Sequence, residues 1–157
     1  MISEIFEKQT LYMENVLYYR GWVTQQTSNE QFAKMETLVT EATAKKNGTI
    51  VTATNAIEMR DGENVMDIEI LIPLDKEIKV SEEYKFIPKF EISNALKIRI
   101  EGNSSQWQTA MQTLSEYMKK YKLQPTTPAL MVTVKAATTP LEIEEMITEI
   151  YVGVKGE

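Results

Sequence analysis

The chain has 157 residues, 43% of them hydrophobic and 25% charged, a composition typical of a folded globular protein. Its net charge of −6 argues against a protein that grips nucleic acid mainly through the phosphates. Cysteine and histidine are both absent, which excludes disulfides, thiolate or histidine catalysis, and metal sites built from those ligands. The N-terminus does not resemble a signal peptide, and no apolar run approaches the about 18 residues of a membrane span, so we expect a cytoplasmic protein.

The first half of the chain alternates between strand and helix patterns. Aromatic and β-branched residues favour strands, an apolar repeat of three to four residues favours a helix, and Asp61-Gly62 is a hairpin turn signal. The expected elements are a strand over 11–23, a helix that starts at the capping box Ser28–Gln31, and strands over 49–59 and 64–74. The helix should bury Phe32, Met35, Leu38, Val39 and Ala42.

The second half repeats this order after a connector. A strand over 96–101 precedes a helix from Trp107 to Tyr121, which Asn103 or Ser104 should cap. Pro125 and Pro128 stop that helix, and strands over 130–134 and 143–154 complete the chain.

Short motifs also recur between the halves. Met66, Glu69 and Ile70 return as Met146, Glu149 and Ile150, 80 residues later, and Gly21 returns as Gly102 at an offset of 81. We therefore predict an α+β fold in which duplicated strand–helix–strand–strand modules form an antiparallel sheet, with two main helices on one face and a central cleft. The single domain 1–157 would consist of module one (about 8–75), a connector (about 76–94) and module two (about 95–155).

Strand alternation assigns the polar residues of both halves to the face opposite the helices. Ile68, Ile70 and Ile72, with Ile150, Val152 and Val154, should pack on the helices. The side chains expected on the opposite face are Tyr18, Arg20, Trp22, Glu69, Leu71, Lys97, Arg99, Glu101, Ile147, Glu149 and Tyr151.

Three segments resemble the gyrase-inhibitor-like small-molecule-binding family, which also forms the effector-binding domain of bacterial multidrug-responsive transcription activators. They are Tyr18-Tyr19-Arg20-Gly21, the aromatic-rich helix 107–121, and Glu149-Ile150-Tyr151-Val152-Gly153-Val154, in which Gly153 replaces a proline of the family pattern. The resemblance implies a duplicated module around a ligand cleft, with Glu149 as the carboxylate that meets cationic aromatic ligands and Tyr18 and Tyr151 as cleft aromatics. A narrower similarity links the chain to uncharacterised stand-alone proteins of Gram-positive bacteria, some of which resemble products encoded near type VII secretion toxin genes.

The candidate ligand-binding residues leave alternatives open. Glu149 and Glu69 could pair with a ligand cation, or with a resident base such as Arg20 or Arg99. The aromatic residues Tyr18, Trp22 and Tyr151 could form a box for a cation, or simply fill a core. The bases could instead select an anionic or zwitterionic ligand. The full set is Glu149, Tyr151, Tyr18, Glu69, Trp22, Arg20 and Arg99.

We expect a small-molecule (effector) binding protein whose ligand occupies the cleft between the modules. No helix-turn-helix pattern precedes Leu11, so direct DNA binding is not expected. The alternative is a protein-interaction or adaptor protein, which could be linked to a type VII secretion toxin locus. A small-molecule hydrolase with Glu149 as base comes third, because no nucleophile, metal or cofactor motif supports catalysis.

Overall fold

The computed structural model describes residues 2–102, 106–135 and 146–156. The chain forms two compact units, here named the N-terminal unit (Tyr12–Phe90) and the C-terminal unit (Met1–Leu11 with Glu91–Glu157). Two long strands, β1 (Phe6–Val23) and β4 (Lys85–Glu101), each contribute residues to both units. Each unit holds one helix and antiparallel strands, so the α+β class predicted from the sequence is confirmed.

In the N-terminal unit, β1 is followed by α1 (Gln25–Glu41), β2 (Val51–Arg60) and β3 (Glu63–Pro73). β3 is the middle strand and pairs antiparallel with both β1 and β2. Asp61 and Gly62 alone join β2 to β3 and have φ values of 50° and 78°, the two positive angles of a type I′ turn. The hairpin predicted at Asp61-Gly62 is therefore confirmed.

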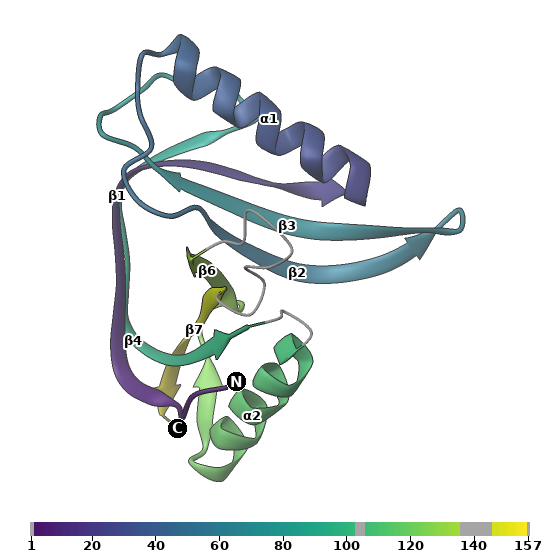
Figure 1. The fold of residues 1–157 in the computed structure, drawn as a ribbon, viewed down its shortest axis with the longest axis vertical. Helices are drawn as coiled ribbons and strands as arrows, with labels where there is room; N and C mark the ends of the chain where they lie inside the picture. The colour runs from purple at the N-terminus through teal and green to yellow at the C-terminus, as the bar shows by residue number, and fades with distance from the viewer. Residues whose placement is uncertain (1, 103–105, 136–145, 157) are drawn as a thin grey trace. The chain divides into compact units, whose positions relative to one another are not determined.

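Helix α1 covers one face of this sheet (Figure 1). Met35 and Val39 of the helix are buried in one apolar cluster with Ile68, Ile70 and Ile72 of β3. Phe32, Leu38 and Ala42 pack around this cluster and are partly buried. The predicted helix-facing residues of both elements are thus the ones that form the core, because the periods of helix and strand each place them on a single side.

The C-terminal unit holds the first residues of β1 and the later part of β4, followed by α2 (Trp107–Lys120), β5 (Leu123–Pro125), β6 (Leu130–Lys135) and β7 (Ile147–Gly156). β7 pairs antiparallel with β4, β6 and the short β5. Ala110 and Leu114 of α2 lie in a core cluster with Ile98, Ile150 and Val152. β5 was not predicted from the sequence, because it is only three residues long and ends at a proline.

Gly153, which stands where the resemblance expects a proline, uses both of its backbone polar groups. Its N–H donates to Thr127 Oγ1 at 2.9 Å and its carbonyl accepts from the Thr126 N–H at 2.7 Å. A Cβ at this position would lie 2.7 Å from Thr126 Oγ1. Proline lacks the N–H that donates to Thr127 and carries a Cβ that would crowd Thr126, so both features disfavour proline here.

Several boundaries differ from the prediction. β1 begins at Phe6 and not at Leu11, and β4 starts at Lys85 within the expected connector. Asn103, Ser104 and the segment 143–145 lie outside the described residues. Neither α1 nor α2, the helices of the described part of the chain, is long and apolar enough to cross a membrane.

The capping box at the start of α1 is formed by Thr24 and Thr27, so the box predicted at Ser28–Gln31 is wrong. The Thr27 N–H donates to Thr24 Oγ1 at 3.2 Å, and the Thr24 N–H donates to Thr27 Oγ1 at 2.7 Å. Ser28 instead lies inside the helix, with its N–H bonded to the Thr24 carbonyl. Threonine serves here at both positions of the reciprocal cap, which usually has Glu or Gln at the second.

The Thr24→Ala substitution is expected to lower the free energy of unfolding by about 1 kcal/mol, because an N–H of the first helical turn loses its acceptor. Ser28→Ala is the matched control and should change stability by less than about 0.5 kcal/mol. Urea denaturation monitored by circular dichroism measures both. A larger loss for Ser28→Ala than for Thr24→Ala would place the cap at Ser28 after all.

Candidate functional site

Both units place an arginine directly opposite a glutamate on neighbouring strands. Arg20 of β1 pairs with Glu69 of β3, and Arg99 of β4 pairs with Glu149 of β7. If Glu69 is aligned with Glu149, the strand registers align Arg20 with Arg99, at an offset of 79 residues. The predicted match of Gly21 with Gly102, at an offset of 81, is therefore two residues out of register.

Both units also carry a β-bulge at the same place relative to the glutamate. In β2, Thr54 pairs with Ile68 while Ala56 pairs with Asp67, so Asn55 is the extra residue. In β6, Thr133 pairs with Thr148 and Lys135 pairs with Ile147, which leaves Val134 as the extra residue. A bulged residue has no partner in the ladder, and the local bend of the strand redirects its side chain.

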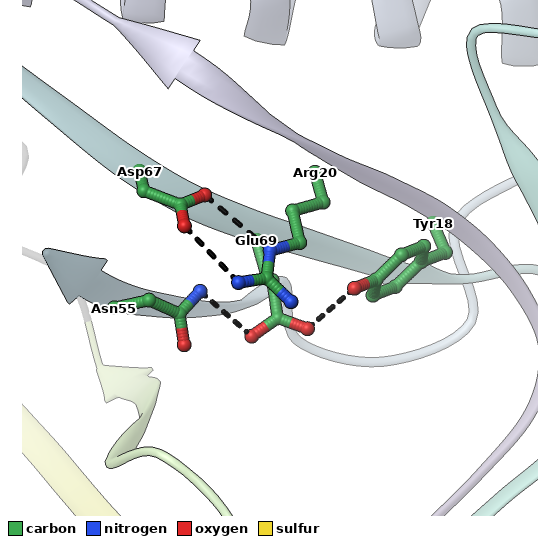
Figure 2. A network of polar contacts seen from close by, with 5 residues as sticks. All are labelled: Tyr18, Arg20, Asn55, Asp67 and Glu69. Carbon is green, nitrogen blue, oxygen red and sulfur yellow. Dashed lines mark hydrogen bonds and ion pairs between the residues drawn. The ribbon is translucent and has the colours of Figure 1, made fainter.

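The Glu69 cluster consists of Tyr18, Arg20, Asn55, Asp67 and Glu69 (Figure 2). Glu69 accepts a short hydrogen bond from the Tyr18 hydroxyl on one oxygen, and one of 3.1 Å from Asn55 Nδ2 on the other. Arg20 turns to Asp67, with Nη2 at 3.1 Å and Nε at 3.4 Å from the two carboxylate oxygens. Glu69 is therefore held by two neutral donors. Arg20, which lies opposite Glu69 in the strand register, pairs instead with Asp67.

These contacts perturb the titration of two members of the cluster. Burial raises the pKa of Tyr18 well above its ordinary value, and the hydrogen bond to Glu69 raises it further. The pKa of Arg20 is raised mainly by its hydrogen bond to Asp67. Tyr18 is consequently a neutral hydrogen-bond donor, and Arg20 a fixed cation, at any ordinary pH.

The Tyr18→Phe variant is expected to lose less stability than the wild type as the pH rises above 10. Because the pKa of Tyr18 is raised in the folded protein, its contribution is intact below about pH 10, the pKa of an unfolded tyrosine. It is lost at higher pH, where the unfolded chain releases the proton first. Melting temperatures between pH 8 and 11.5 measure the effect, and parallel curves for the two proteins would contradict it.

Trp22 lies beyond this cluster on β1 and has a cationic neighbour of its own. The guanidinium carbon of Arg60 is 4.7 Å from the centre of the Trp22 ring, and 42% of Trp22 is exposed. One face of this ring is thus occupied by a resident cation–π contact. The aromatic box expected from Tyr18, Trp22 and Tyr151 stays a prediction.

The Glu149 cluster consists of Lys97, Arg99, Glu149 and Tyr151 in the C-terminal unit. Glu149 Oε2 lies 3.3 Å from Lys97 Nζ and 3.7 Å from Arg99 Nε, and only 13% of the Glu149 side chain is exposed. Tyr151 is 9% exposed, and burial, followed by the charge of Glu149, raises its pKa. Of the two sequence hypotheses for Glu149, pairing with the resident base Arg99 is thus observed, and Lys97 joins it.

The two clusters differ at the positions that satisfy the charges. The bulged Asn55, which donates to Glu69, is replaced by Val134 in the C-terminal unit. The place of Asp67, which pairs with Arg20, is taken by Ile147. In agreement with these replacements, Arg99 Nε is buried and has no hydrogen-bond partner among the described residues.

The structure therefore separates the seven predicted site residues into two groups. Tyr18, Arg20 and Glu69 are brought together in one unit, and Arg99, Glu149 and Tyr151 in the other, while Trp22 contacts Arg60. The candidate set omitted Asn55, Asp67 and Lys97, although Lys97 was expected on the face opposite the helices and Asp67, two residues before Glu69 on β3, shares the face of Glu69. Among residues 2–102, 106–135 and 146–156, no three Asp or Glu side chains lie close enough together to hold a metal ion. The cleft expected between the modules stays a prediction.

No protein-family model and no curated protein matches this chain. Among solved structures, it is similar to the C-terminal domain of EcmrR, with a TM-score of 0.71 and 16% identity over 95% of this chain and 98% of that domain. It matches EcmrR in an EcmrR–DNA complex with a TM-score of 0.70 and covers 58% of that chain, less than two thirds of its length. It is also similar to an uncharacterized conserved protein from Listeria innocua, with a TM-score of 0.58 and 10% identity. That match spans 94% of this chain and 91% of the Listeria protein. The chain has the fold of the EcmrR C-terminal domain, which confirms at the level of fold the resemblance predicted from its sequence.

Proposed function

We propose that this protein binds a small organic molecule, and that the Glu149 cluster is its main ligand contact. The observation that carries the proposal is a charged cluster that is largely removed from solvent and incompletely satisfied by the protein. Three ionised groups lie there beside a buried aromatic ring, and one arginine nitrogen has no acceptor among the described residues. A buried donor without a partner destabilises the free protein, and a bound solute can supply a partner for the same guanidinium.

The Glu69 cluster provides an internal comparison. There, each carboxylate has a donor within 3.5 Å, and Arg20 has two contacts to Asp67. Such a cluster fits a structural role, since each of its charged groups has a hydrogen-bond partner within the protein. The contrast favours the Glu149 cluster over the Glu69 cluster as the ligand-binding one, and the resemblance also points to the strand of Glu149.

Repetition of the Arg–Glu pairing and of the β-bulge supports the duplication predicted from the sequence. Two copies of one module explain why the clusters occupy the same register positions in their strands. Under this proposal one copy keeps a self-satisfied polar cluster, and the other has exchanged the satisfying residues at Val134 and Ile147. The fold shared with the C-terminal domain of EcmrR is compatible with this division of roles.

The proposal is tested by thermal unfolding in the presence of three compounds with the same ring and different charge. They are naphthalene-2-carboxylate, naphthalene-2-carboxamide and 2-naphthylmethylamine, each at millimolar concentration. At least one should raise the melting temperature, because a ligand present at 100 times its dissociation constant stabilises the folded state by about 2.7 kcal/mol.

The response should depend on the aromatic member of the cluster. Tyr151→Leu is expected to remove most of the shift, because the aromatic ring beside Lys97 is lost. Tyr121→Leu is the matched control, since Tyr121 lies at the end of α2 and is 52% exposed, and it should leave the shift unchanged. Absence of a shift with all three compounds would contradict the proposed function.

A further inference from the structure

The Glu149 cluster has an imbalance of charge among its partly buried groups. Lys97 and Arg99 share the one carboxylate of Glu149, and both contact the same oxygen. The cluster therefore has a net charge of +1 at neutral pH. The Glu69 cluster has the opposite sign, since Asp67 and Glu69 accompany Arg20 alone.

Arg99 is the group whose charge is least well matched. Its Nε lies 3.7 Å from Glu149, which is longer than a hydrogen bond, and has no other acceptor among the described residues. Although Nε is buried, 39% of the side chain is exposed, so this exposure belongs to other parts of the side chain. The N–H groups at the end of a guanidinium fork bind carboxylate and phosphate groups in pairs, which a lysine cannot do.

One further acid belongs to this strand face. Glu101 lies two residues after Arg99 on β4 and is exposed, and it takes part in an interaction of its own. Solvent screens its charge more strongly than that of Glu149, so it offsets the positive charge of the cluster only weakly.

Aromatic rings border the positive charge. Lys97 Nζ lies 5.9 Å from the centre of the Tyr151 ring and 5.3 Å from that of Phe6, which is 38% exposed. Burial, the charge of Glu149 and a hydrogen bond to Glu149 raise the pKa of Tyr151, so its phenol is neutral at neutral pH and adds no negative charge. Positive charge beside aromatic surface is complementary to an anionic group attached to an apolar ring.

We propose that the ligand is an organic anion whose carboxylate or phosphate binds Arg99 and Lys97 while its apolar part packs on Tyr151. This inference rests on the proposed function and specifies the ligand class. It departs from the cationic ligands that the resemblance implies, because the resident bases already supply the cations that Glu149 would otherwise attract. Glu149 then acts as the group with which the incoming anion competes.

The experiment compares the three naphthalene compounds on the wild type and on three variants, by isothermal calorimetry and thermal unfolding. The carboxylate should bind tightest, the carboxamide more weakly, and the ammonium compound not measurably. Arg99→Met should weaken carboxylate binding about tenfold or more, since a charge-assisted hydrogen bond is lost. Lys46→Met, which removes one exposed positive charge from the N-terminal unit, is the control and should bind like the wild type.

Glu149→Gln gives the clearest result, because an anionic ligand and a cationic ligand predict changes of affinity in opposite directions. For an anionic ligand, the loss of the competing carboxylate should tighten binding about threefold or more. For a cationic ligand, the same change should weaken it. A gain of affinity cannot arise from a variant that fails to fold.

The outcomes distinguish failure of the anionic ligand from failure of the proposed function. Preferential binding of the carboxylate, tightened by Glu149→Gln, supports both. Preferential binding of the ammonium compound, weakened by Glu149→Gln, overturns the anionic ligand and leaves the proposed function standing. Binding of all three compounds with equal affinity also overturns the anionic ligand. Absence of binding contradicts both.

Discussion

Replacing Ile70 with alanine is expected to lower the free energy of unfolding by about 2 to 5 kcal/mol. Ile70 has no exposed surface and lies in the core between β3 and α1. The truncation removes three methyl or methylene groups and leaves a cavity that the surrounding strand and helix residues close only in part. Ile150 has the same burial in the C-terminal unit, so Ile150→Ala should cost a similar amount.

Ile57→Ala is the matched control for this pair, because it makes the same chemical change on the same sheet at a residue that is 63% exposed. Its effect should stay below about 0.5 kcal/mol. Guanidinium denaturation of the three variants gives the comparison. A small effect at either buried isoleucine, equal to that at Ile57, would contradict the assigned core of that unit.

The Glu149→Gln variant is expected to be less stable than the wild type in the absence of ligand, by about 1 to 3 kcal/mol. The substitution leaves Lys97 and Arg99 close together with no carboxylate between them, and partly buried charges without a partner are unfavourable. The combination with Lys97→Met should recover part of the loss, because one of the two repelling cations is then gone.

Glu58→Gln is the control, since Glu58 pairs with Arg60 at 2.8 Å but both side chains are more than half exposed. Such a surface pair contributes about 0 to 1 kcal/mol. The free energy of unfolding is measured by denaturation at two salt concentrations. The proteins compared are the wild type, Glu149→Gln, its combination with Lys97→Met, and Glu58→Gln. Equal losses of stability for Glu149→Gln and Glu58→Gln would show that the charges of the Glu149 cluster behave like an exposed surface pair, which contradicts an incompletely satisfied buried site.

Together with the binding experiment, this result would show stability and affinity moving in opposite directions at one residue. Under the proposed function, Glu149 would stabilise the ligand-free protein by pairing with Lys97 and Arg99, and it would compete with an anionic ligand for the same two cations. A residue that only maintains the fold would change stability without sharpening affinity.

The elements were predictable from sequence wherever a period or a turn signal was strong. The alternation along β3, the apolar stripe of α1 and the Asp61-Gly62 turn are local patterns, and each had one physical interpretation. The start of β1 was missed because Phe6-Glu-Lys-Gln-Thr is mostly polar and exposed on both sides. The cap of α1 was misplaced because several Ser and Thr residues precede the apolar stripe, and only the backbone angles decide between them.

The sequence predicts on which face of the sheet each site residue lies, but not which side chains contact one another. Alternation placed Glu69, Arg20 and Asp67 on one side of the sheet, yet which acid Arg20 contacts depends on side-chain conformation. The role of Asn55 depends on a bulge, which shifts alternation by one residue and leaves no local signal in Thr54-Asn55-Ala56. Pairing between strands 47 or 50 residues apart cannot be read from short motifs.

The two bulges have a consequence for how readily this protein could change its ligand. Since neither Asn55 nor Val134 takes part in the strand register, either can be exchanged without moving a neighbouring residue to the wrong side of the sheet. Each is a place where a single codon change adds or removes a polar group beside a glutamate while the scaffold stays intact. Selection, or a protein engineer, could therefore retune one binding surface at Val134 and leave its counterpart at Asn55 untouched.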